Sequence, residues 1–310
     1  MSEFFLELFS EEIPAKLQKN SREKIFEDFL RFFEQRSIKS KRSFSLSSPN
    51  RLVIVFEGLD KQIKIESEEI KGPKISAPDQ AINGFLRSNK IEKKDLYTKK
   101  NEKDEFYFFR TKSKIIKIHD LLEQYVPKIL ENHQWKKSMK WGEFDLNWGR
   151  PLKSILSIFD KKIINFEFHH LVSSNLTFID KDLEEKKKSF KNFKDYERFF
   201  VKQGIYIDQN KRLKIIKNQF SKILNKKKLK IYENTKLIDE VVNLVDSPNI
   251  LLCKFDKKFL SVPKEILTLT MESHQKYFPT FDYKNEITNE FLIVANKKDY
   301  KGLIKIGNER

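Results

Sequence analysis

Apolar residues in this chain occur in short runs, and the run at residues 52–56 is as long as any other. A helix that crosses a bilayer needs about 20 predominantly apolar residues, so no membrane-spanning helix and no membrane partner are expected. Short runs of this kind suit buried strands and the inner faces of amphipathic helices. The pattern therefore predicts a soluble protein built from short strands and packed helices.

The cysteine content and the N-terminus indicate the compartment. Cys253 is the single cysteine, which excludes an internal disulfide and any zinc site built from several cysteines. Glu3, Glu7, Glu11 and Glu12 interrupt the N-terminal stretch, whereas an export signal has a basic start and an unbroken apolar segment. Both observations predict a cytoplasmic protein.

Strand and helix patterns mix along the chain without a regular strand–helix–strand rhythm. One helix begins at Pro14, where the missing N–H is not needed, and Pro127 is expected to kink or shorten a helix at residues 121–131. These patterns predict an α+β fold with a mixed or antiparallel sheet and packed helices. The expected strands lie at residues 3–9, 43–46, 52–56, 106–111, 152–159, 163–168, 249–255 and 291–295, and the further helices at 81–88, 237–245 and 263–275.

Composition divides the chain into three parts. Residues 1–180 form an N-terminal α+β region, residues 181–235 a lysine-rich helical insertion or subdomain that breaks near Gly204, and residues 236–310 a second α+β segment. The chain length agrees with about two domains. We therefore expect an α+β body that carries a lysine-rich helical segment.

The formal net charge of +17 does not by itself identify a nucleic-acid partner. Only 11 of the 62 basic residues are arginine, and 28 residues are phenylalanine, a profile expected when AT-rich codons bias a whole proteome. Lysine is also the weaker choice for bidentate contacts to phosphates and bases. Judged by charge alone, binding to a polyanion and the absence of such a partner are therefore equally expected.

The sequence contains no recognisable pattern of catalytic or cofactor-binding residues. Its eight glycines form neither a GxGxxG nor a GxxxxGK[ST] phosphate loop, which argues against nucleotide binding by either motif. His169 and His170 are adjacent, so on a strand they would point to opposite faces and could not bind one ion together. We predict no catalytic residue, no metal ligand and no cofactor in this chain.

Two clusters combine basic and aromatic residues, and these are the candidate RNA-binding positions. An unpaired RNA end can use cations for its phosphates and aromatic faces for its bases. The alternative is that the tryptophans and Phe278 belong to the core, with lysines extending from its edge. The candidate residues are Lys136, Lys137, Lys140, Trp141 and Arg150 in the first cluster, and His274, Lys276 and Tyr277 in the second.

A series of short motifs spans nearly the whole chain. The segment from Asp239 to Phe278 carries the densest group of them. Because the motifs are ordered and widely spread, chance explains them poorly. In chain order they are Phe4-Phe5-Leu6-Glu7-Leu8, Glu11-Glu12-Ile13-Pro14, Ser48-Pro49-Asn50-Arg51-Leu52, Lys71-Gly72-Pro73, Lys140-Trp141-Gly142 with Arg150-Pro151, Asp239-Glu240-Val241-Val242 with Asp246-Ser247-Pro248, His274-Gln275-Lys276-Tyr277-Phe278-Pro279, Val294-Ala295-Asn296 and Gly307-Asn308-Glu309-Arg310.

Together these motifs resemble the N-terminal portion of the bacterial glycyl-tRNA synthetase beta subunit. The resemblance implies a fold like the B3/B4-type module of phenylalanyl-tRNA synthetase, which residues 236–310 would complete. The family's HD-like and anticodon-binding domains are expected to be absent, because the sequence ends at the Gly-Asn-Glu-Arg motif. One departure lies at residues 174–178, where Ser-Asn-Leu-Thr-Phe replaces a family segment with a histidine and an arginine, so any role of those two residues is lost or moved.

The resemblance implies a function within a complex. In this family a separate alpha subunit uses ATP with Mg to activate glycine and transfers it to tRNA-Gly, while the beta subunit contributes tRNA binding and assembly of an α2β2 heterotetramer. This fragment alone is therefore expected to be inactive. Two alternatives stay open: a stand-alone basic RNA-binding module, and a hydrolase that edits mischarged tRNA, for which no nucleophile–base spacing is visible.

Overall fold

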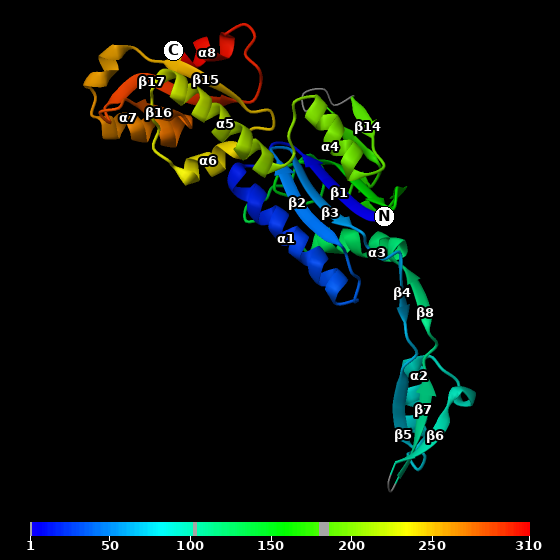
Figure 1. Cartoon of the computed structure of the whole chain (residues 1–310). Helices are drawn as coiled ribbons and strands as arrows, with labels where there is room; N and C mark the ends of the chain where they lie inside the picture. Colours follow the sequence, from blue (N-terminus) through cyan, green and yellow to red (C-terminus); the bar gives the residue numbers. More distant parts are fainter. Residues whose placement is uncertain (1, 102–103, 180–185) are drawn as a thin grey trace. The chain divides into compact units, whose positions relative to one another are not determined.

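The computed structural model describes residues 2–101, 104–179 and 186–310 (Figure 1). The chain forms two compact units, a larger one made of Met1–Leu59 and Leu122–Arg310 and a smaller one made of Asp60–Leu121. Both contain helices and sheets, and the described strands pair antiparallel. This arrangement confirms the predicted α+β class. The boundaries predicted from composition do not include the smaller unit.

The larger unit is organised around a five-stranded sheet with β1 at its centre. Two-residue turns join neighbouring strands. Pro49 and Asn50 connect β2 to β3, and Asp160 and Lys161, both with positive φ, connect β9 to β10 in the manner of a type I′ turn. From edge to edge the strands are β10 (Lys162–Ile163), β9 (Leu152–Phe159), β1 (Glu3–Ser10), β3 (Arg51–Glu57) and β2 (Arg42–Ser48).

Helices cover both faces of this sheet. Phe4 and Phe5 of β1 point to opposite faces, because side chains alternate along a strand. Phe4 packs on Phe29 with ring centroids 5.3 Å apart, and Phe5 packs on Tyr196 at 5.0 Å. Burial on both faces explains the nearly continuous apolar sequence of β1. The two helices are α1 (Ala15–Glu34), which begins after Pro14 as predicted, and α4 (Phe193–Lys202).

A second core forms where two helices pack on a three-stranded sheet. Ile216, Leu237 and Leu292 are buried together in it. The Gln18 side-chain amide donates to the carbonyl oxygen of Asn243 at 2.7 Å and ties this part to α1. Its elements are α5 (Gln209–Lys227), α6 (Thr235–Val242), and the strands β15 (Asn249–Lys254), β17 (Ile287–Ala295) and β16 (Phe278–Phe281) in that order across the sheet.

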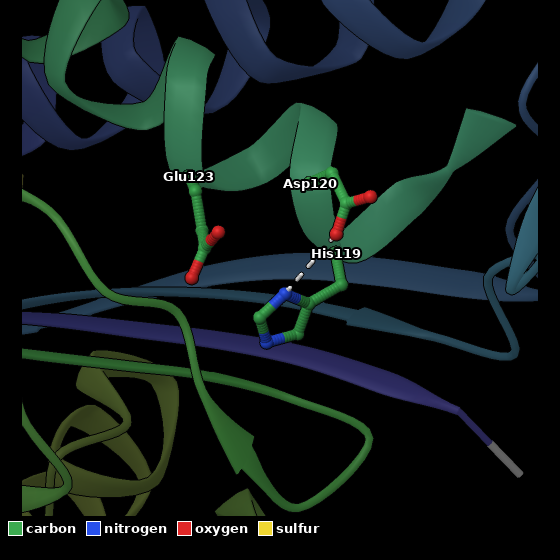
Figure 2. A group of neighbouring side chains, drawn as sticks. All are labelled: His119, Asp120 and Glu123. Atoms are coloured by element: carbon green, nitrogen blue, oxygen red, sulfur yellow. Dashed lines mark ion pairs between the residues drawn. The ribbon is translucent and has the colours of Figure 1, made fainter.

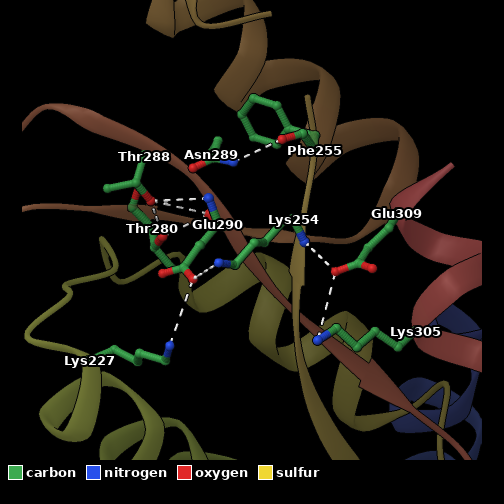
Figure 3. Close-up of polar contacts among 9 residues, drawn as sticks. All are labelled: Lys227, Lys254, Phe255, Thr280, Thr288, Asn289, Glu290, Lys305 and Glu309. Atoms are coloured by element: carbon green, nitrogen blue, oxygen red, sulfur yellow. Dashed lines mark hydrogen bonds and ion pairs between the residues drawn. The ribbon is translucent and has the colours of Figure 1, made fainter. Parts of the chain in front are cut away.

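Two carboxylates contact Lys254 of β15, an edge strand of this second sheet. A carboxylate oxygen of Glu290 lies 3.2 Å from the Lys254 ammonium and 4.0 Å from that of Lys227 (Figure 3). Glu309, in the C-terminal helix α8 (Leu303–Glu309), accepts the backbone N–H of Lys254 at 2.8 Å. The Glu309 hydrogen bond therefore joins α8 to β15, and the Glu290 ion pair joins β17 to β15.

The smaller unit contains a two-stranded ladder and a three-stranded sheet in the order β5-β7-β6. Helix α2 packs on one face of that sheet, where the rings of Phe85 and Phe109 meet at 5.8 Å. Gly72 permits this approach, because a Cβ there would lie 2.7 Å from the Phe85 ring. The elements are β4 (Gln62–Ile65), β5 (Glu69–Lys74), α2 (Asp79–Asn89), the 3-10 turn η1 (Lys93–Asp95), β6 (Tyr97–Asn101), β7 (Asp104–Arg110) and β8 (Lys114–Lys117).

The elements not yet described are the helix α3 and several shorter strands, helices and turns. No helix among the described residues combines the length and apolarity needed to cross a bilayer. The short strands β11 and β12 pair as a hairpin, and β13 pairs with β14. The elements are α3 (Ile118–Glu131), β11 (Glu167–Phe168), β12 (Leu171–Val172), β13 (Leu176–Phe178), β14 (Lys187–Ser189), the 3-10 turn η2 (Lys257–Ser261), α7 (Lys264–Thr270) and the π-helical turn η3 (Met271–Gln275).

Three local predictions are wrong in detail. Residues 163–168 do not form one strand: β10 ends at Ile163, β11 begins at Glu167, and the Ser173 hydroxyl bonds to the backbone of Ile164 and Phe166. The helix predicted at residues 263–275 changes to π-helical geometry after Thr270. Of the two effects expected of Pro127, shortening does not occur, because α3 continues to Glu131.

Candidate RNA-binding surface

The first basic–aromatic cluster lies in the segment between α3 and β9, and buried tryptophans anchor it. Trp135 and Trp148 are 9% and 2% exposed, with ring centroids 5.2 Å apart. Gly149 permits this packing, because a Cβ at its position would lie 2.3 Å from the Trp135 ring. Trp148 is also paired with Met139 across a short antiparallel bridge. The core alternative is therefore correct for these two tryptophans.

The cations of this cluster extend into solvent. Lys136, Lys137 and Lys140 are exposed. The Lys140 ammonium lies 3.5 Å from the exposed carboxylate of Asp145, a surface pair that contributes little and leaves the ammonium available to a phosphate. Arg150 is half-buried, and its guanidinium donates to the preceding carbonyl oxygen at 2.9 Å.

Trp141 remains half-exposed and belongs to a strip of rings. His170 stacks on Phe144 with centroids 3.7 Å apart and meets Trp141 edge-on at 5.7 Å. Phe144 is 42% exposed, and burial lowers the pKa of His170. The predicted set omits Phe144 and His170. Phe144 lies within the tryptophan-rich segment, whereas nothing in the sequence pattern links that segment to His170.

The two adjacent histidines occupy a turn and not a strand. His169, with a φ of 51°, and His170 connect β11 to β12. His169 Nε2 lies 2.9 Å from a carboxylate oxygen of Glu131 at the end of α3, while His170 contacts the aromatic strip. The expected strand geometry is therefore wrong at these two residues, and it is the turn that directs the two rings to different neighbours.

A cavity of about 400 Å³ adjoins the first cluster. Its lining includes Trp135, Trp148, His133 and Phe168. His133 is 6% exposed, and burial lowers its pKa from 6.5 to about 4, so the ring is neutral at pH 7. The lining also includes the carboxylates of Glu131 and Asp145, so the cavity combines ring faces with polar groups.

The second predicted cluster is more strongly engaged in the fold. The Lys276 ammonium lies 3.1 Å from a carboxylate oxygen of Glu240, and Phe278 is a core residue at 2% exposure. Tyr277 stacks on Phe291 with centroids 4.8 Å apart. His274 is exposed on the π-helical turn. The candidates of the two clusters therefore lie in different parts of the larger unit, one beside α3 and β9 and the other beside β15–β17.

One group of side chains has atoms close enough to share a cation. His119, Asp120 and Glu123 lie on the first turns of α3, with ligand atoms all within 4.8 Å of one another (Figure 2). His119 Nδ1 is 3.8 Å from a carboxylate oxygen of Asp120. Glu123 also accepts the backbone N–H of Asn165 at 3.1 Å, so this group already takes part in structural contacts. It carries no metal assignment.

The sequence motifs contact one another in pairs. Asn296 Oδ1 accepts the backbone N–H groups of Asp246 and Ser247 at 2.8 and 2.9 Å, which joins two motifs fifty residues apart. The Tyr277 hydroxyl donates to Asn308 Oδ1 at 2.7 Å and joins two more. The motifs thus hold distant segments in register, which is a structural role.

A buried ionic network links the N-terminal motifs. Glu7 Oε1 accepts from Arg51 Nε at 2.8 Å and from the Tyr196 hydroxyl at 2.6 Å, and neither Glu7 nor Arg51 is more than 2% exposed. Burial and the Glu7 charge raise the pKa of Tyr196 well above its usual value. Arg51 also donates to the carbonyl oxygen of Phe178. The segment at residues 174–178, which differs from the family pattern, therefore has a structural role here.

Comparison with known proteins agrees with these motifs. The family model described as "Glycyl-tRNA synthetase beta subunit" matches residues 4–310. The chain is 37% identical over 311 residues to the "Glycine--tRNA ligase beta subunit" of Rickettsia akari (strain Hartford) and 38% identical to the protein of that name from Rickettsia africae (strain ESF-5). Each alignment covers 100% of this chain and 47% of the relative, so the chain spans about half the length of these curated relatives. The chain belongs to the glycyl-tRNA synthetase beta subunit family.

Proposed function

We propose that this chain contributes tRNA binding and alpha-subunit binding to a glycine–tRNA ligase, as part of its beta subunit. The observation that carries the proposal is the contrast between buried motifs and exposed cations. Asn296 and Arg51 hold distant segments together. Lys136, Lys137 and Lys140, by contrast, lie in solvent, and the half-exposed Trp141 follows Lys140 in the chain. The scaffold therefore presents a basic, aromatic surface.

In this proposal the chemistry takes place on the alpha subunit. That subunit binds ATP with Mg and glycine and transfers the activated glycine to tRNA-Gly, within an α2β2 heterotetramer. The surface described above supplies cations that position the RNA backbone without reading its sequence. Trp141 and Phe144 supply ring faces for unstacked bases.

Glycylation by the assembled enzyme tests the proposal. The full-length beta subunit that contains this chain is purified with its alpha subunit, and glycylation of tRNA-Gly is measured against alpha alone. Beta is expected to increase the activity strongly and to copurify with alpha. If full-length beta adds nothing to the activity of alpha, the proposed function is wrong.

A matched pair of variants tests the surface. Lys136→Ala with Lys137→Ala should raise the KM for tRNA several-fold with a smaller change in kcat, because backbone contacts bind the ground state and the transition state alike. Lys222→Ala with Lys226→Ala removes the same charge from exposed positions on α5 and should change KM little. Equal effects of the two pairs would assign the binding to net charge and not to this surface.

A further inference from the structure

The open face of the three-stranded sheet in the smaller unit gathers rings and cations. Residues directly opposite each other on paired strands share one face of a sheet. Phe108 of β7 is opposite Tyr97 of β6 and Lys71 of β5, and Phe106 is opposite Lys99. All three rings are half-buried and all the lysines are exposed. One face of this small sheet is therefore both aromatic and basic.

The other face of the same sheet is already covered. Phe109, the neighbour of Phe108 along β7, points the opposite way and is 5% exposed beneath α2. Ile82 is the buried residue of α2, with 5% of its surface exposed. The unit therefore has an apolar core of its own between α2 and the sheet. Phe106 and Phe108 are not needed to fill it.

The lysines of the open face are held over the rings. The Lys71 ammonium lies 3.6 Å from the centroid of Phe106, and the Lys99 ammonium lies 5.6 Å from that of Phe108. Tyr97 stacks beside Phe108 with centroids 6.3 Å apart and an interplanar angle of 25°. Exposed cation–π contacts of this kind are weak, so a base can displace the Lys71 ammonium from the Phe106 ring and leave it free to meet a phosphate.

The charge on this face has the sign that a polyanion requires. Glu69 is opposite Arg110 and pairs with Lys99 at 2.6 Å, and Asp104 pairs with Lys74 at 2.7 Å. Both acidic groups are thus already neutralised by a neighbour. The charged residues of the face are Lys71, Lys74, Lys99 and Arg110 against Glu69 and Asp104, which leaves a positive excess.

We propose that this face, formed by Tyr97, Phe106 and Phe108 with Lys71, Lys74 and Lys99, binds a single-stranded segment of RNA. Alternate residues of one strand are about 6.8 Å apart, so Phe106 and Phe108 offer successive stacking positions along an extended chain. Sheets that bind single-stranded RNA use rings in this way, with cations along the backbone. The inference rests on the proposed function for its ligand class and adds a second RNA contact within Asp60–Leu121.

The affinity of the whole 310-residue chain for RNA tests this assignment. The probe is a fluorescein-labelled single-stranded RNA of about 10 nucleotides, compared with the same strand in a duplex by fluorescence anisotropy. Phe106→Ala with Phe108→Ala should weaken binding of the single strand about tenfold or more and binding of the duplex much less. Loss of both affinities in equal proportion would overturn the proposal.

Two neighbouring lysines provide a charge-matched control. Lys99 points to the open face, whereas Lys100 is opposite Glu105 on the other face. Lys99→Ala should weaken binding of the single strand several-fold, and Lys100→Ala should leave it unchanged. Equal effects of the two substitutions would show diffuse attraction and not a site.

Crosslinking of the unaltered chain makes the test independent of folding in the variants. RNA that contains 4-thiouridine should crosslink within residues 97–110, and mass spectrometry locates the position. Crosslinks confined to the larger unit would overturn the proposal. The proposal would also be overturned if the Phe106→Ala, Phe108→Ala variant kept its affinity for RNA but no longer bound the alpha subunit, since the face would then bind protein. If beta still increases glycylation in either case, only the RNA platform fails and the proposed function stands.

Discussion

Arg51→Met is expected to destabilise the larger unit by about 3–5 kcal/mol, the usual cost of removing one partner of a buried ion pair. The side chains of Arg51 and Glu7 are 2% and 0% exposed, so the remaining carboxylate would be shielded from water and without its cationic partner. It would keep the hydrogen bond from the Tyr196 hydroxyl at 2.6 Å. The Phe178 carbonyl would also lose the donor that Arg51 supplies.

Glu7→Gln tests the sign of this interaction. In the unaltered chain the substitution leaves the Arg51 guanidinium buried without its carboxylate, so stability should fall by about 3 kcal/mol. In the Arg51→Met background it removes a buried carboxyl group that has lost its cationic partner, so stability should rise by about 2 kcal/mol. The amide oxygen can accept from Tyr196 in both backgrounds. The same substitution thus changes sign, which additive packing effects do not produce.

Urea unfolding followed by tryptophan emission measures these changes, because the three tryptophans all lie in the larger unit. Arg42→Met is the matched control: Arg42 lies 3.8 Å from Glu57 on the same sheet, but its side chain is 69% exposed. The control should change stability by about 0.5 kcal/mol or less. If Arg51→Met costs no more than Arg42→Met, or if Glu7→Gln destabilises both backgrounds, the buried pair does not stabilise the sheet as described.

Three further changes test the core and the cavity. Stability should fall by up to about 3 kcal/mol as pH decreases from 6.5 to 4, because the unfolded chain binds a proton at His133 near pH 6.5 and the folded chain only near about 4. His133→Phe should flatten the dependence of stability on pH in urea titrations at several pH values. An unchanged pH dependence would assign it to other groups. Gly149→Ala should cost about 1–3 kcal/mol by overpacking against Trp135, seen as a lower Tm, and a neutral result would show that the ring can move. Phe278→Ala should cost about 3–5 kcal/mol, and a loss below about 1 kcal/mol in urea unfolding would show that Phe278 is not a core residue.

Strands were predictable where an apolar run ends at turn residues. The runs at residues 3–9, 52–56 and 152–159 correspond to the three inner strands β1, β3 and β9. The strand β6, with the sequence YTKKN, has no such run and forms because it pairs with β7. Strand preference depends strongly on such neighbours, so polar strands of the smaller unit left little trace in the pattern.

The candidate surface was predictable only in part. The exposed lysines stand where the sequence placed the first cluster, but their role in RNA binding stays a prediction. Composition did not separate Trp148, which is buried, from Trp141, which is half-exposed. His170 joins Trp141 through a hairpin turn, a contact that spacing along the chain does not encode.

Sequence by itself determined the α+β class, the family and the short strands and helices that carry the core, because each depends on local periodicity or on ordered motifs. Tertiary structure alone decided which charges meet. Glu7 and Arg51 are neighbours because β1 and β3 pair in one register, and a shift by one residue would turn each side chain to the other face. It also decided that residues 60–121 form a unit of their own, since compactness is a property of contacts between distant segments.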